Sequence, residues 1–296
     1  IVSGGVVKCW GSKPVGEIGD GTSGTNILSP TAVSGISTGS SVAGGSGYSC
    51  VLFSDGTVKC WGNNDSGQLG DGTTISRYPE VSVSGITTAT AIAGGSSHTC
   101  ALLSDSTIKC WGSNGAGQLG DGTTTTRTTP VSVSGITTAT AIAVGSSHTC
   151  ARLSDSTIKC WGYTYYGSLG DGTTTNQTIP VSVSGITTAT AVAAGLYHTC
   201  ARLSDSTIKC WGLNNSGQLG DGTQTNRTTP VSVSGITTAT AIAAGGSHTC
   251  ALLSDSTIKC WGWNGSGQLG DGAAVFIPTL ASGITTATAV AVGQYH

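Results

Sequence analysis

The chain has 296 residues, of which only 9% are charged, and its formal net charge is −2. This balance argues against a nucleic-acid-binding protein, because the sequence supplies no basic excess to displace counterions from phosphates. The 47 glycines, with abundant serine and threonine, favour strands and turns over helices. No apolar run approaches the roughly 20 residues that a membrane-spanning helix needs, so we expect no membrane span.

A four-residue signature, Lys-Cys-Trp-Gly, recurs at a spacing of 51 residues once and 50 residues thereafter. Its copies lie at 8–11, 59–62, 109–112, 159–162, 209–212 and 259–262. A period of this length is typical of repeat architectures in which each unit needs its neighbours to bury its faces. The tryptophan of each copy, one per unit and within a predicted strand, is expected to serve packing.

One unit of the repeat predicts four short strands, which we call A to D in chain order. They are expected at about 140–144, 149–153, 157–161 and 181–183, separated by turn residues. Four antiparallel strands in 50 residues predict an all-β fold, a single β-propeller of four-stranded blades. The repeat count gives six blades, or seven if the chain continues.

The first and last residues of the chain align with the same part of the repeat. Aligning Trp10 with Trp111 starts the chain inside strand B and ends it just before strand B. We therefore expect residues 1–296 to form one propeller in which 1–35 and 284–296 share the closing blade.

The eleven cysteines occupy two fixed positions of the repeat. A three-residue turn centred on Asp105 would place Cys100 directly opposite Cys110, at a separation that a disulfide spans. We predict five disulfides: Cys50–Cys60, Cys100–Cys110, Cys150–Cys160, Cys200–Cys210 and Cys250–Cys260. Cys9 is expected to stay unpaired, because the matching cysteine would fall just past the end of the sequence.

This cysteine pattern also bears on the compartment. The alternative to disulfides is a set of buried reduced thiols, whereas zinc is disfavoured because the pairs lack close Cys-x-x-Cys spacing. Disulfides persist in oxidising surroundings, so we expect an extracellular or cell-surface protein.

Histidine and aspartate also recur at fixed positions. The histidines are His98, His148, His198, His248 and His296. Copies one blade apart are held apart by the blade spacing, so we expect a hydrogen-bonded structural role. Asp121 and its copies sit in Leu-Gly-Asp-Gly turns, where aspartate caps its own backbone, and no second carboxylate is clustered nearby for calcium. No unit has a distinctive nucleophile. We therefore predict no catalytic residues, no metal site and no cofactor.

Three recurring segments carry a resemblance to a known family: Gly145-Ser-Ser-His-Thr-Cys-Ala151, Trp111-Gly112 and Gly117-Gln-Leu-Gly-Asp-Gly-Thr123. The chain resembles the regulator of chromosome condensation repeat family over essentially its whole length. The resemblance implies a β-propeller, usually of seven blades. The family's namesake is a nuclear exchange factor for a small GTPase, but this chain departs from it in its cysteine pattern and its lack of basic tails. A secreted bacterial relative, which inhibits β-lactamases with aromatic loops, agrees better with the predicted compartment.

The segments that differ between repeats are the A–B loop and the long C–D loop, which lie on the same face of an up-down blade. Loops held by a rigid scaffold often carry function, and aromatic side chains dominate binding hot spots. We predict a binding face centred on Tyr163, Tyr165, Tyr166, Leu196, Tyr197, Trp263 and Tyr295. The alternative is neutral drift among duplicated loops.

The expected function is an extracellular, non-enzymatic recognition or structural module that binds a protein or glycan partner, with adhesion or self-assembly as forms of that role. One alternative is a secreted enzyme inhibitor. Another is a guanine nucleotide exchange factor for a small GTPase, which requires a reducing compartment. An enzyme acting on polysaccharide would need paired carboxylates in one pocket, whereas Glu17 and Glu80 are the only glutamates.

Overall fold

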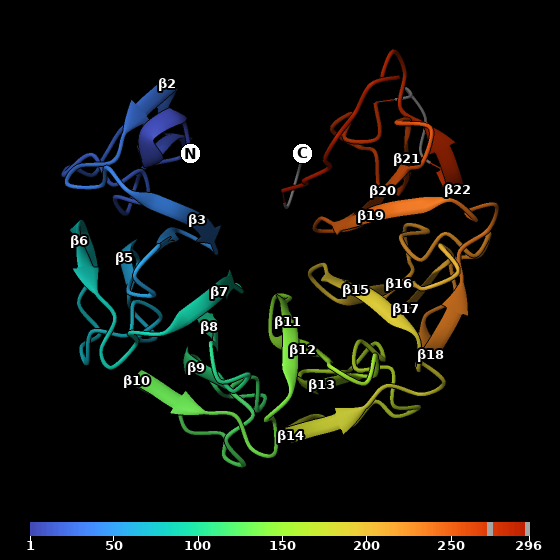
Figure 1. The fold of residues 1–296 in the computed structure, drawn as a ribbon, viewed down its shortest axis with the longest axis horizontal. Helices are drawn as coiled ribbons and strands as arrows, with labels where there is room; N and C mark the ends of the chain where they lie inside the picture. The colour runs from blue at the N-terminus through green and yellow to red at the C-terminus, as the bar shows by residue number, and fades with distance from the viewer. Residues whose placement is uncertain (271–274, 294–296) are drawn as a thin grey trace. The chain divides into compact units, whose positions relative to one another are not determined.

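The computed structural model describes residues 1–270 and 275–293 (Figure 1). Apart from a 3₁₀ turn at Ser3–Gly5, every regular element in these residues is a β-strand. The strands form five four-stranded sheets and one two-stranded sheet. The described residues contain no helix long and apolar enough to cross a membrane. The chain divides into two compact units, Ile1–Ile142 and Ala143–His296.

The first unit begins with the two-stranded sheet, in which β1 (Lys8–Gly11) pairs antiparallel with β2 (Ile27–Ala32). Two four-stranded blades follow, and each strand pairs with its neighbour in the chain. The first blade contains β3 (Gly39–Gly44), β4 (Tyr48–Phe53), β5 (Val58–Gly62) and β6 (Arg77–Ser82). The second contains β7 (Ala89–Gly94), β8 (His98–Leu103), β9 (Ile108–Gly112) and β10 (Arg127–Ser132).

The second unit holds the remaining blades, and the boundary between the units falls within β11. The first of these blades contains β11 (Ala139–Val144), β12 (His148–Leu153), β13 (Ile158–Gly162) and β14 (Gln177–Ser182). The next contains β15 (Ala189–Ala194), β16 (His198–Leu203), β17 (Ile208–Gly212) and β18 (Arg227–Ser232). The last contains β19 (Ala239–Ala244), β20 (His248–Leu253), β21 (Ile258–Gly262) and β22 (Val275–Leu280).

The predicted strands A, B and C match β11, β12 and β13 to within a residue at each end, but the predicted strand D, 181–183, covers only the last part of β14. β14 starts at Gln177 rather than Val181. Its pairing with β13 passes from Gly162↔Gln177 to Cys160↔Val181 across a β-bulge, and Pro180 lies in the bulged segment. Strand D is the outermost strand of the blade, where a missing backbone N–H is tolerated. The proline interrupts the strand pattern of the sequence, so the first part of this strand was not predicted.

Neighbouring blades within a unit pack through aliphatic side chains, a disulfide and one tryptophan. The cluster between the first two blades of the second unit includes Ile158, Leu169, Leu203 and Trp211. Trp61, Trp111, Trp161, Trp211 and Trp261 are all fully buried, as the packing role predicts. Trp10 differs, because it is 60% exposed. It lies on β1, whose sheet has only two strands among the described residues.

Candidate functional site

Each B–C hairpin carries a disulfide between directly opposed residues. In the first blade of the second unit Cys150 pairs in register with Cys160, and their Cα atoms are 4.1 Å apart. All five predicted pairs form disulfides. Cys9 is the free cysteine among the described residues, and burial raises the pKa of its thiol. The hairpin is therefore a cross-linked structural unit.

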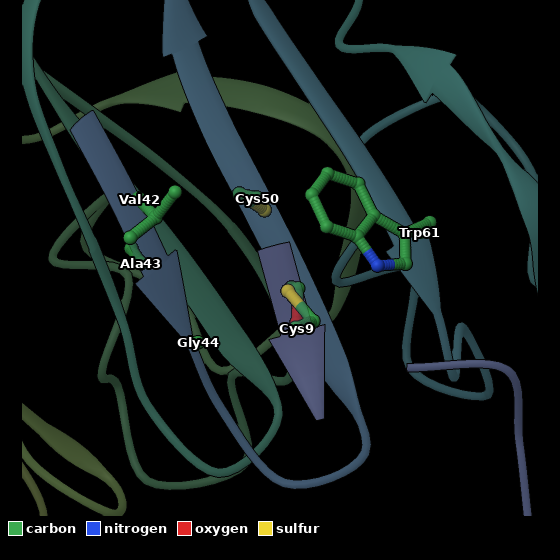
Figure 2. A pocket seen from close by; sticks show the side chains of 7 residues that line it. Cys9, Val42, Ala43, Gly44, Cys50 and Trp61 are labelled. Carbon is green, nitrogen blue, oxygen red and sulfur yellow. The ribbon is translucent and has the colours of Figure 1, made fainter. Parts of the chain in front are cut away.

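The free thiol lines a small cavity in the first unit. Figure 2 shows this cavity of about 180 Å³, to which β1, β3, β4 and β5 contribute. Its lining residues are Cys9, Val42, Ala43, Gly44, Ser49, Cys50 and Trp61. The Cys9 thiol is the titratable side chain among these lining residues, and the others are apolar, small or disulfide-bonded.

The repeated histidines join neighbouring blades. His148 Nε2 lies 2.9 Å from Thr199 Oγ1 in the next blade. The Thr199 hydroxyl itself donates to the carbonyl oxygen of Ser168, at 2.9 Å, so His148 Nε2 must carry a proton and donate. Burial lowers the pKa of His148 to about 4 and that of His198 to about 3, which keeps both rings neutral at pH 7.

Tyr48 occupies the same position in the first complete blade. Its hydroxyl donates to the carbonyl oxygen of His98 in the next blade, at 2.6 Å. A tyrosine thus performs the bridging role of the histidines, which supports a structural function for this position. Among the described residues, no group of three or more His, Cys, Asp and Glu side chains could hold a metal ion.

The variable loops meet at one end of each blade. The C–D loop begins with a backbone hydrogen bond to the A–B loop, as in Tyr163 N to Ser147 O, at 2.8 Å, and Leu213 N to Tyr197 O, at 2.9 Å. The invariant connections meet at the opposite end, where Ala189 N donates to Ser156 O at 2.9 Å. The two variable loops therefore open together, as the strand order predicts.

Four tyrosines of the predicted face form one aromatic group, the tyrosine cluster: Tyr163, Tyr165, Tyr166 and Tyr197. The ring centroids of Tyr163 and Tyr197, which come from neighbouring blades, are 5.8 Å apart. Tyr166 lies 5.6 Å from Tyr197 and 5.0 Å from Tyr165, in edge-to-face geometry. Such edge-to-face pairs are favoured because the positive ring edge meets the negative ring face.

The tyrosine cluster is open to solvent at its edge. Tyr165 is 66% exposed, whereas Tyr163, Tyr166 and Tyr197 are half-buried. Burial, followed by the neighbouring tyrosines, raises the pKa of Tyr163, so its hydroxyl stays protonated at neutral pH. Leu196 is also half-buried, and its carbonyl oxygen accepts from Ser146 N at 3.2 Å. The cluster offers apolar rings together with phenolic hydroxyl groups.

The second predicted group is only partly described. Trp263 begins its C–D loop as Tyr163 does, because its backbone N–H donates to Ser247 O at 2.8 Å. Its ring lies over its own loop, since a Cβ atom on Gly265 would come within 2.5 Å of Trp263 Cζ2. Tyr295, the expected partner of Trp263, lies outside the described residues.

One feature that the sequence interpretation missed is a clamp inside the C–D loops. Arg227 donates from Nε and Nη2 to Asp221 Oδ2, at 3.0 and 2.8 Å, and Asn214 Nδ2 donates to Asp221 Oδ1 at 3.1 Å. The pairs Arg77–Asp71 and Arg127–Asp121 repeat this arrangement.

The loop that carries the tyrosines has lost this clamp. Thr164, Ser168 and Gln177 stand where the clamped loops carry asparagine, glutamine and arginine. Asp171 keeps its place in the turn but accepts only from Thr173 among the hydrogen bonds of the described residues. A comparison of the repeats at these three positions would have found the difference.

Models of the regulator of chromosome condensation (RCC1) repeat match residues 55–102, 110–152, 160–202 and 210–252. A second model of the same repeat matches 40–68, 89–118, 139–168, 189–218 and 239–268. The chain belongs to the RCC1 repeat family. The RCC1 match at 160–202 contains the whole tyrosine cluster.

Several solved structures share the fold of this RCC1-repeat chain. Human WBSCR16 is 22% identical, with a TM-score of 0.80 over 90% of this chain and 74% of its own. Prp20p from Saccharomyces cerevisiae is 21% identical, with a TM-score of 0.83 over 99% of this chain and 78% of its own. The ectodomain of the Physcomitrella patens receptor kinase CR4 is 23% identical, with a TM-score of 0.60 over 99% of this chain and 63% of its own. At these identities the likeness shows the fold alone, the RCC1-type β-propeller.

Proposed function

We propose that this RCC1-repeat protein is an extracellular, non-enzymatic recognition module that binds a protein or glycan partner through the tyrosine cluster. The observation that carries the proposal is the cluster itself. It gathers four of the chain's seven tyrosines from two neighbouring blades. At the matching positions the other loops carry mainly small or polar residues such as Ser113, Ala116 and Ser147.

Tyrosine suits this role because it supplies a large contact area, loses little conformational entropy and keeps a polar hydroxyl. The half-buried rings of Tyr163, Tyr166 and Tyr197 support one another, so the surface is formed before a partner arrives. A preorganised surface saves the ordering cost that a flexible loop would incur on binding.

The surroundings of the bridging histidines and the hairpin aspartates support a non-enzymatic role. The histidines that bridge the blades are fully buried and neutral, and the hairpin aspartates cap their own turns, as Asp155 Oδ1 does by accepting from Thr157 N at 3.0 Å. These groups are committed to structure, which leaves them unavailable as general acids or bases.

The disulfides support an extracellular site of action, because a reducing compartment would open them. The structural relative Prp20p binds Gsp1p and histones. A role on histones would place this chain inside the cell, among reducing thiols. A secreted enzyme inhibitor is the second candidate, and the same exposed aromatic cluster would serve it.

The test replaces the cluster with residues that the other blades already carry. The variant Tyr163→Ser, Tyr166→Ser, Tyr197→Ser takes its serines from Ser113, Ser216 and Ser147, so we expect it to fold normally. Wild type and variant are compared on a glycan array and against a random 12-residue phage-displayed peptide library. We expect wild-type ligands whose affinity falls at least tenfold in the variant, about 1.4 kcal/mol.

The matched control is Ser113→Leu, which takes its residue from Leu213 at the same loop position and lies outside the predicted binding face. Ligands of the tyrosine cluster should bind this control as they bind wild type. The proposal fails if every ligand found with either library binds the triple-serine variant as tightly as wild type, or if neither library yields a ligand.

A further inference from the structure

We infer that the partner of the tyrosine cluster is a polypeptide segment that places an arginine against Asp171. This inference rests on the proposed function, because it takes the tyrosine cluster as the binding surface. It goes further in assigning the class of ligand and a second recognition residue.

The aspartate of the Leu-Gly-Asp-Gly turn has a cation of its own in the other loops whose aspartate is described. Asp221 has Arg227 at 2.8 Å, and Asp71 and Asp121 have matching arginines at 2.9 Å. Even the divergent N-terminal loop supplies one, since Lys13 Nζ lies 2.6 Å from Asp20 Oδ2. In each of these loops the turn aspartate is therefore paired with a cationic side chain of the same loop.

The loop with the tyrosines is the exception. Gln177 replaces the arginine, and within the part of the chain that the structure describes Asp171 is held only by Thr173, whose N–H and Oγ1 donate to the carboxylate at 3.0 Å. The surroundings are also more open, because Thr173 is exposed while Thr73, Thr123 and Thr223 are half-buried. Asp171 is therefore a carboxylate whose own loop provides no cationic side chain to pair with it.

Asp171 belongs to the same C–D loop as Tyr163, Tyr165 and Tyr166. Thr164 stands between Tyr163 and Tyr165, and its counterpart Asn214 donates to the aspartate of its own loop at 3.1 Å. Thr164 Oγ1 accepts a hydrogen bond from Leu169 N at 3.2 Å. This bond to the backbone is the second contact that the asparagine makes in the clamped loops. Because residue 164 keeps this backbone contact, we infer from the Asn214–Asp221 contact that Asp171 lies near residue 164, which is flanked by Tyr163 and Tyr165.

Arginine is the side chain that fits both features. Its planar guanidinium matches a carboxylate in the way that Arg227 matches Asp221, and it also stacks on aromatic faces. A neutral glycan would satisfy the rings but leave Asp171 without a cation. Charge complementarity therefore favours a polypeptide with arginine over a sugar.

The test restores the missing clamp from within the chain. Gln177→Arg recreates the residue of the three clamped loops, so the variant should fold, and it should occupy Asp171 while leaving every tyrosine in place. Peptides are selected from the random 12-residue phage library on the wild-type chain. We expect those that depend on the tyrosine cluster to be enriched in arginine and to lose affinity at least tenfold on both Gln177→Arg and Asp171→Asn.

Gln224→Arg is the matched charge control, because it adds one positive charge to the exposed C–D loop of the next blade. The selected peptides should bind this control within about threefold of wild type. Peptides that need the tyrosines yet bind Gln177→Arg and Asp171→Asn as tightly as wild type would overturn the inference and leave the proposed function standing. If glycans bind and no peptide does, the inference is likewise overturned and the proposed function stands. If the ligands bind the triple-serine variant as tightly as wild type, both the inference and the proposed function are wrong.

Discussion

His148 and His198 each place Nε2 2.9 Å from a threonine hydroxyl in the next blade, with the ring fully buried. The sequence predicted a structural role for these rings, because a side chain that recurs from blade to blade serves a repeated structural need. It could not predict their pKa values, which depend on burial in the assembled unit.

The packing between these neighbouring blades links two differences between the repeats, at residues 48 and 94. Tyr48 replaces the histidine in one blade, and the next blade carries Gly94 where the later blades carry Val144, Ala194 and Ala244. A Cβ atom on Gly94 would come within 2.9 Å of the Tyr48 hydroxyl and 2.8 Å of Gly44 O. The Tyr48 hydroxyl and the Gly44 carbonyl oxygen therefore both leave too little room for a Cβ atom at residue 94.

The buried histidines make stability depend on pH. An unfolded histidine has a pKa near 6.5, whereas in the folded chain the pKa is about 4 for His148 and about 3 for His198. Below pH 6.5 the unfolded chain binds more protons than the folded chain, so the free energy of unfolding should fall as the pH drops from about 6.5 toward 4. Urea unfolding at pH 7 and pH 4.5 measures this loss. The variant His148→Asn, His198→Asn should show a shallower loss, and an equal loss in both proteins would contradict the assignment.

Among the elements, the B–C hairpin was the most predictable. Its ten-residue cysteine spacing fixes the register, and the turn aspartate fixes the geometry, as Asp105 Oδ1 accepts from Thr107 N at 3.0 Å and from Thr107 Oγ1 at 2.7 Å. Strand D was the least predictable, because its pairing passes through a bulge that contains a proline. The C–D clamp depends on side chains six residues apart, which no strand or turn pattern reveals.

Removing one bridge tests the hairpin as a cross-linked unit. The variant Cys150→Ala, Cys160→Ala should lose roughly 2–3 kcal/mol of unfolding free energy, since the bridge closes a short loop in the unfolded chain. Urea unfolding at pH 7 measures the difference, and the wild type under reducing conditions should lose more because all five bridges open. A change below about 0.5 kcal/mol would show that the bridge adds little to stability.

At the scale of the whole molecule, the fold class followed from the repeat period. The 50-residue spacing predicted four-stranded blades, and both the RCC1 matches and the structural likenesses confirm the propeller. That residues 1–35 and 284–296 share a closing blade stays a prediction. The function is harder to predict, because one fold serves many partners and its use depends on the few loops that differ.

The central claim is that recognition belongs to the loop pair that carries the tyrosine cluster. A chain in which 163–177 is replaced by the sequence of 113–127, and 196–197 by that of 246–247, tests it most directly. The replacements restore the clamp and remove the tyrosine cluster without introducing any sequence foreign to the protein. We predict that this chain melts no lower than wild type and loses at least tenfold in affinity for the ligands selected on wild type. A loop-exchanged chain that folds and binds those ligands with unchanged affinity would contradict the claim.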